Sequence, residues 1–123
     1  MNKNEAIRIL NNKLAPSRLS VRNTHCSNLV EYRVEIIWWL NVPFHKFEQD
    51  LYLILNDKPN NCFYCIKLPA QTVPTPQNEF RDKQGTADIF MPSSGRKRMV
   101  DTQSASSEFD FNSYQAAKVK YEI

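Results

Sequence analysis

Glycine is scarce in this sequence, with only two among 123 residues. Loops that cradle phosphate groups need several glycines close together, so the sequence excludes a glycine-rich nucleotide-binding loop. The chain also lacks any run of roughly 18 apolar residues, the length that a membrane span requires. Its polar N-terminal segment has no continuous apolar stretch like that of a secretory signal. We therefore expect neither a membrane span nor a secretory signal.

Cysteine is sparse as well: the chain has three, an odd number. An odd count fits free thiols in a reducing compartment better than a disulfide framework. Together with the starting methionine, it predicts a cytoplasmic protein. The hydrophobic share of 41% and charged share of 24% are ordinary for a globular protein, and the net charge is only +3. We expect one folded domain over residues 1–123, compatible with nucleic acid but not strongly basic.

The N-terminal segment predicts a short helix over residues 4–14. Its apolar residues recur at helical spacing and form one stripe. They are Ala6, Ile7, Leu10 and Leu14. Asn2 or Asn4 could cap the helix, and Pro16 ends it because proline cannot continue a helix.

Strand patterns dominate after the helix. Residues 32–42 alternate with period two, and the even positions form a continuous apolar face. A shorter strand is expected at residues 19–21, with a turn at 24–28. Residues 51–55 and 62–68 flank a run of turn-forming residues and predict a hairpin.

A weaker hairpin is predicted from residues 87–91 and 98–102 around a Pro-Ser-Ser-Gly turn. The loop over residues 69–86 is longer than most structureless loops, which indicates a function or mobility. Residues 113–123 fit either a helix or a strand. The fold class expected from these patterns is α+β, with the N-terminal helix packed on a mostly antiparallel sheet of five to seven strands.

Two cysteines form a C-x-x-C spacing, Cys62-Phe63-Tyr64-Cys65. With His25 and Cys26 they could in principle supply four zinc ligands. The motif lies in a strand pattern, however, where residues three apart point to opposite faces of a sheet. Two sulfurs on opposite faces cannot share a metal ion or a disulfide. We therefore expect two buried thiols in a strand, no metal and no cofactor.

The neighbouring Trp38 and Trp39 must also face opposite sides of their sheet. Trp38 belongs to the apolar face and is expected in the core. Trp39 and Ile37 lie on the mixed face, which a chain of this size leaves uncovered unless a partner binds there. A second copy of the chain is the simplest such partner, so we expect a homodimer. A pocket for a small molecule or a second protein is the alternative, lined by Trp39 with Tyr52 or Tyr64.

The segment Arg96-Lys97-Arg98 is predicted at the tip of the weaker hairpin. Three cations beside serine hydroxyls could contact phosphate groups, so nucleic acid is a second candidate partner. No nucleic-acid-binding motif accompanies them. The alternative is that these three residues form a solvated turn with no binding function.

Residues 85–102, GTADIFMPSSGRKRMVDT, resemble part of the metal site of PD-(D/E)xK nucleases. In that family two acidic groups on adjacent strands hold Mg²⁺, and Asp88 and Asp101 match them. The resemblance implies Mg²⁺-dependent cleavage of nucleic acid as an alternative function. The family continues with a lysine two positions after the second acid, where this chain has Gln103; Lys97 or Lys118 would have to replace it. The leading interpretation remains a small non-enzymatic binding protein.

Overall fold

The computed structural model describes residues 2–13, 19–104 and 108–121 of the chain. In chain order its elements are α1 (Lys3–Lys13), β1 (Thr24–Ser27), β2 (Leu29–Tyr32), β3 (Glu35–Pro43), η1 (Phe44–Glu48), β4 (Leu51–Asp57), η2 (Lys58–Asn60), β5 (Cys62–Leu68), α2 (Pro76–Glu79), β6 (Arg81–Lys83), β7 (Thr86–Pro92), η3 (Asn112–Tyr114) and β8 (Gln115–Lys120). The predicted α+β class is confirmed. The strands form two four-stranded sheets instead of one sheet of five to seven.

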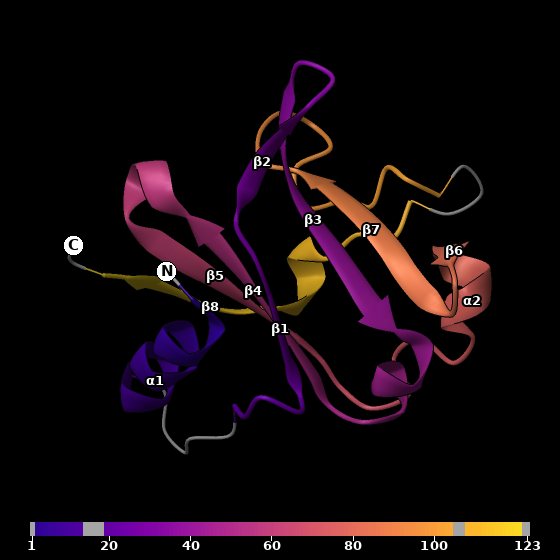
Figure 1. The fold of residues 1–123 in the computed structure, drawn as a ribbon, viewed down its shortest axis with the longest axis horizontal. Coiled ribbons are helices and arrows are strands. Elements are labelled where there is room, and N and C mark those ends of the chain that lie inside the picture. The colour runs from indigo at the N-terminus through magenta and orange to yellow at the C-terminus, as the bar shows by residue number, and fades with distance from the viewer. Residues whose placement is uncertain (1, 14–18, 105–107, 122–123) are drawn as a thin grey trace.

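The two sheets and the helix form three layers (Figure 1). Sheet A has the strand order β1-β4-β5-β8, and sheet B has the order β2-β3-β7-β6. One apolar core lies between the sheets and a second lies between sheet A and α1. No described element covers the other side of sheet B, which we call the outer face.

The helix α1 begins as the sequence predicts. The Glu5 amide donates to Asn2 Oδ1 at 2.8 Å, which identifies Asn2 as the N-cap. Ala6, Ile7 and Leu10 are buried against sheet A. Leu14 and Pro16, which the prediction also used, lie outside the described residues.

The prediction for residues 19–28 is wrong. Residues 19–21 were expected to form a strand, but the backbone N–H and C=O of Leu19 bond to the side chain of Asn11 in α1. Residues 24–28 were expected to turn, but 24–27 form β1 and pair in parallel with β4. The sequence gives no signal for a parallel partner that lies 28 positions further along the chain, as in the pair Thr24 and Tyr52.

The chain passes from sheet A to sheet B between β1 and β2. Ser27 stabilises this crossing, because its hydroxyl accepts a hydrogen bond from the Trp39 amide and donates one to the Trp39 carbonyl, both at 3.0 Å. The side chain therefore replaces the backbone partner that β3 loses where the chain changes sheets.

The strong hairpin is confirmed as β4 and β5. The C-terminal segment, which fits helix or strand in sequence, adds β8 to sheet A beside β5. The loop over 69–86 is partly ordered, since it contains α2 and β6.

The weaker hairpin is only half correct. Residues 86–92 form β7, but 98–102 form no strand: residues 98 and 99 belong to a turn, and Val100 makes an isolated bridge with Asp110. Met99 has a positive φ of 61° and a fully buried side chain, which breaks the extended conformation. The Phe90 amide donates instead to the Asp101 carboxylate, at 3.2 Å. A side chain thus supplies the acceptor that a second strand would have supplied.

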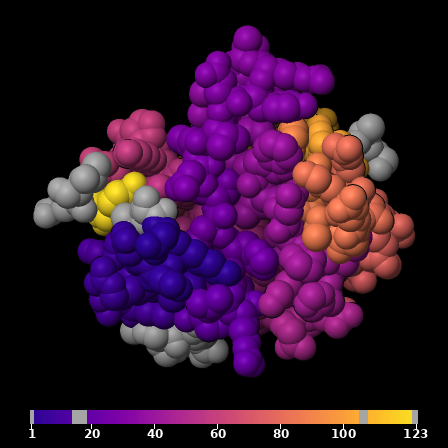
Figure 2. Space-filling model, in the orientation of Figure 1, coloured from indigo at the N-terminus to yellow at the C-terminus, as the bar shows by residue number. Residues whose placement is uncertain are grey.

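The period-two pattern of β3 holds only over the part that faces sheet A. Trp38, Leu40 and Val42 are buried between the sheets. Val34 and Ile36 continue the even series but are 96% and 46% exposed. Residues 29–37 form a hairpin arm that projects past the rest of the molecule (Figures 1 and 2). We call it the β2–β3 arm.

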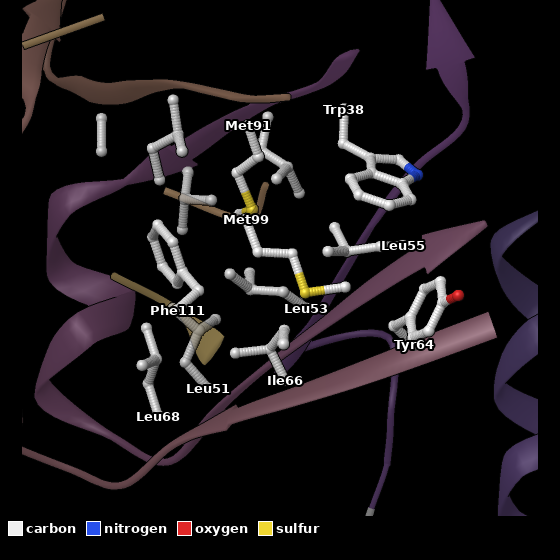
Figure 3. Packing of buried hydrophobic residues seen from close by; sticks show 14 of the residues in the cluster. Trp38, Leu51, Leu53, Leu55, Tyr64, Ile66, Leu68, Met91, Met99 and Phe111 are labelled. Carbon is white, nitrogen blue, oxygen red and sulfur yellow. The ribbon is translucent and has the colours of Figure 1, made fainter. Parts of the chain in front are cut away.

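Trp38 lies at one end of the core between the sheets (Figure 3). Its indole is fully buried, lies edge-on to Tyr64, and donates to the Asn56 carbonyl at 2.9 Å. Sulfur-containing and branched side chains from both sheets and from the segment after β7 continue the core beside it. They include Leu53, Leu55, Met91 and Met99.

We expect Trp38→Ser to unfold the domain. Emptying such a site costs about 3–5 kcal/mol, and it leaves the Asn56 carbonyl unpaired in the core. A domain of this size has roughly 5–15 kcal/mol in total. Urea titration followed by far-ultraviolet circular dichroism measures the loss. The matched control is Val21→Ser, at a position 59% exposed, which should change stability by no more than about 0.5 kcal/mol.

Candidate binding surface

The two cysteines of the C-x-x-C spacing lie on opposite faces of β5, as the strand period predicts. Cys62 is buried between the sheets, whereas Cys65 is buried between sheet A and α1. Burial raises the pKa of the Cys65 thiol to about 11, so the thiol stays protonated. The described residues contain no group of three or more histidine, cysteine or acidic side chains that could hold a metal ion. That the chain uses no cofactor stays a prediction.

The outer face of sheet B carries a cluster of three aromatic rings. Trp39 lies 4.8 Å from Phe90 and 6.1 Å from Tyr32, measured between ring centroids. Phe90 is buried beneath the other two, while Trp39 is 39% exposed and Tyr32 is 37% exposed. The three rings pack against one another at steep angles, which is a favourable aromatic geometry.

The expected exposure of Ile37 is wrong. Its side chain is only 2% exposed although it points to the outer face. Val30 on β2 and Pro92 on β7 are its cross-strand partners on either side, so neighbouring strands cover it. Trp39 alone of the predicted pair reaches solvent.

Cations border the aromatic cluster. The Lys83 ammonium lies 5.2 Å from the centroid of Trp39, and the Arg33 guanidinium carbon lies 5.3 Å from that of Tyr32. Both distances are within the range of cation–π attraction. A shallow groove of about 410 Å³ runs along Trp39, lined by polar and apolar residues. They are Cys26, Ser27, Asn28, Val30, Asn41 and Lys83.

The buried Asp88 carboxylate holds the Trp39 side chain in place. It accepts hydrogen bonds from Trp39 Nε1 at 2.6 Å and from Asn41 Nδ2 at 2.7 Å. It also accepts from Gln103 Nε2 at 3.0 Å and contacts the Arg81 guanidinium at 3.3 Å. Burial opposes ionisation, but these donors, with the charge of Lys83, outweigh it and lower the pKa of Asp88. The exposed indole is therefore held in one orientation by an ionised group.

Asp101 lies next to this network in a different environment. Its Oδ1 accepts from the backbone amides of Phe90 and Gln103, whereas its buried Oδ2 has no hydrogen-bond partner among the described residues. Burial, together with the nearby charge of Asp88, raises the pKa of Asp101 in spite of its backbone hydrogen bonds. The structure thus brings the two predicted acids together through Gln103 but gives them opposite pKa shifts.

This geometry bears on the resemblance to PD-(D/E)xK nucleases. Mg²⁺ needs octahedral oxygen ligands, yet donor groups already occupy both oxygens of Asp88. The position where that family has lysine is Gln103, and its amide donates to Asp88. Asp101 also lies outside any strand. The two acids are explained as parts of the fold, since one orients Trp39 and the other completes the edge of β7.

The other predicted binding residues lie apart. Tyr52 is buried between sheet A and α1, and Tyr64 is buried between the sheets, so neither shares a pocket with Trp39. In the basic segment, Lys97 pairs with Glu108 at 2.6 Å and Arg98 stacks on Tyr64 at 4.7 Å. Arg96 is exposed. The three cations therefore do not form one free patch.

The tip of the β2–β3 arm is the feature that sequence reasoning missed. Arg33 and Val34 connect the paired residues Tyr32 and Glu35, and both have positive φ, 49° and 64°. Such two-residue turns favour asparagine and glycine, and a β-branched residue at positive φ is strained by about 1–3 kcal/mol. Without either turn residue, the sequence gives no signal that the strand 32–42 is really interrupted here.

Comparison of the chain with protein-family models, with curated proteins and with solved structures gives no significant match. No described helix has the length and apolar character needed to cross a membrane. The function therefore has to follow from the chemistry of the surface itself.

We expect Asp101→Asn to change how stability depends on pH. The raised pKa means that the folded state holds this proton more tightly than the unfolded chain. The stability contributed by Asp101 is therefore full below its ordinary pKa and is lost as pH rises through the raised value. The amide retains the Oδ1 acceptor and carries no charge, so it should remove this loss. Thermal midpoints across pH 3 to 9 test the expectation, and an unchanged slope in the variant would contradict it.

Proposed function

We propose that this protein is a non-enzymatic interaction module that self-associates, as a dimer, through the β2–β3 arm. The observation that carries the proposal is where the exposed apolar side chains lie. Six large hydrophobic residues are exposed in the described part of the chain, and four of them lie on the arm. They are Val30, Tyr32, Val34 and Ile36. Such a concentration is typical of surfaces that a partner covers.

The charges near the arm favour a protein partner over nucleic acid. Arg33, Arg81 and Lys83 are opposed by Glu31, Glu35 and Asp88 on the arm and the adjoining outer face. A surface that binds phosphates carries a net excess of cations, because each contact neutralises a backbone charge. Balanced charges around aromatic residues are instead typical of protein–protein interfaces and suit a surface that binds its own copy.

The outer face around Trp39 is a second candidate surface, for a small molecule or another protein. It is supported by the fixed orientation of the indole, since a rigid aromatic anchor loses little entropy on binding. The free thiols of the chain suit a reducing compartment, and we propose a cytoplasmic location.

Light scattering coupled to size exclusion, run from 1 to 100 µM, tests the self-association. We expect a dimer for the wild type and a shift toward monomer for Ile36→Ser, because Ile36 is half-exposed on the arm. Val21→Ser removes an apolar side chain outside the arm that is 59% exposed, more than Ile36, and should leave the dimer intact. A wild-type monomer throughout this range would reject the proposal.

Trp39→Ser in the same experiment separates the two surfaces. We expect the dimer to persist and the stability to fall by about 1–3 kcal/mol, because buried Asp88 loses a donor. Trp39→His, which keeps a ring N–H, is the comparison for the lost donor. Loss of the dimer in Trp39→Ser would instead place the interface on the outer face.

A further inference from the structure

The tip of the β2–β3 arm is chemically unfavourable for an isolated chain. Val34 is 96% exposed and adopts the left-handed backbone conformation that glycine or asparagine fills without strain. A valine here improves neither the turn nor the solubility. Arg33 beside it contacts the Tyr32 ring and forms no ion pair with a described residue. The tip therefore presents one apolar group and one cation to the surroundings.

A groove of about 470 Å³ lies along the inner side of the same arm. Its apolar lining comes from Leu29, Val34 and Ile36 of the arm and from Pro59 and Pro92. Its charged lining residues are both acidic, Asp57 and Glu35. The arm projects past the rest of the molecule (Figure 1), and Ile36 is 46% exposed, so the described chain leaves this part of the groove open. The groove is apolar and acidic and shares Val34 with the tip, whose other residue, Arg33, is a cation.

We propose that the arm tip of one copy seats in this groove of a second copy, and that the contact is repeated by two-fold symmetry. Val34 would pack on Ile36 and Leu29 of the partner, and the Arg33 guanidinium would meet the partner's acidic rim. This deepens the self-association proposed above and rests on it.

A second copy is the occupant because the groove matches the tip in two independent respects. Apolar area meets apolar area, which supplies the favourable free energy of association. Opposite charges meet at the rim, which fixes the orientation and excludes partners with an acidic tip. Tip and groove lie on one arm, so a two-fold axis places the tip of each copy in the groove of the other. The tip–groove contact therefore occurs twice in each dimer.

Val34→Gly separates association from folding. Glycine accepts the positive φ without strain, so the thermal midpoint should be no lower than in the wild type. The apolar anchor is lost, and we expect the dimer dissociation constant from analytical ultracentrifugation to rise at least tenfold. An unchanged dissociation constant overturns the proposal. Because glycine suits this turn, a weaker dimer cannot be attributed to unfolding of the variant.

A charge exchange on the arm tests the rim contact. Arg33→Glu places two acids together across the proposed interface, and Glu35→Arg places two cations together, so each should weaken the dimer at least tenfold. The double variant Arg33→Glu/Glu35→Arg should recover most of the loss. Glu48→Arg is the matched control, because Glu48 is exposed on η1, outside both the arm and the groove.

The outcomes distinguish this inference from the proposed function. A wild-type dimer that tolerates Val34→Gly and all charge variants overturns the tip-in-groove contact but leaves self-association standing. A dimer that dissociates only in the Trp39→Ser variant also overturns the tip-in-groove contact, and it places the interface on the outer face. A wild-type monomer overturns both proposals.

Discussion

The period-two alternation of β3 is the constraint on which the rest of this structure depends. Two adjacent tryptophans cannot share one face of a strand, so burying Trp38 forces Trp39 outward. Each indole N–H then finds a different acceptor: a core carbonyl for Trp38 and the Asp88 carboxylate for Trp39. The first interaction joins the two sheets, since Asn56 belongs to β4. The second fixes an aromatic side chain on the only sheet face in the described chain that lacks a covering layer.

The neighbouring carboxyl groups of Asp88 and Asp101 have pKa values shifted in opposite directions by their local environments. Asp88 receives four donors and is stabilised as an anion, so it orients Trp39, Asn41 and Gln103 around one negative charge. Asp101 accepts hydrogen bonds from the backbone amides of Phe90 in β7 and of Gln103, where the following segment makes only isolated backbone hydrogen bonds to β7. Its second oxygen has no hydrogen-bond partner among the described residues, and burial disfavours its charge. Paired acids with opposite pKa shifts often indicate catalysis, but here hydrogen-bond donors of the fold account for the lowered pKa of Asp88, and burial with the charge of Asp88 accounts for the raised pKa of Asp101.

The β2–β3 arm illustrates a conflict between local and global preference. A glycine or asparagine turn would relax the backbone, and a polar tip would suit water better than valine. A sequence that keeps an unfavourable local choice is commonly constrained there by function. Because the arm also projects beyond sheet A, its inner residues lose the cover that the same strand pattern has in the core. Strain and exposure therefore coincide at one place on the molecule.

The sequence by itself determined the features that depend on neighbours along the chain. These are the capped helix at Lys3–Lys13, the hairpin of β4 and β5, the burial of Trp38, and the opposite placement of Cys62 and Cys65. Their physical basis is local: helical spacing, strand alternation and turn-forming residues.

Only the tertiary structure decided which strands meet. The parallel pairing of β1 with β4, the division into two sheets and the register that places Phe90 under Trp39 all join segments far apart in the chain. The same pairing buries Ile37 between two strands and leaves Ile36 without cover on the arm. The period-two alternation of a strand shows which side chains share a face of the sheet. It does not show which element packs against that face, and the burial of the side chains depends on that element.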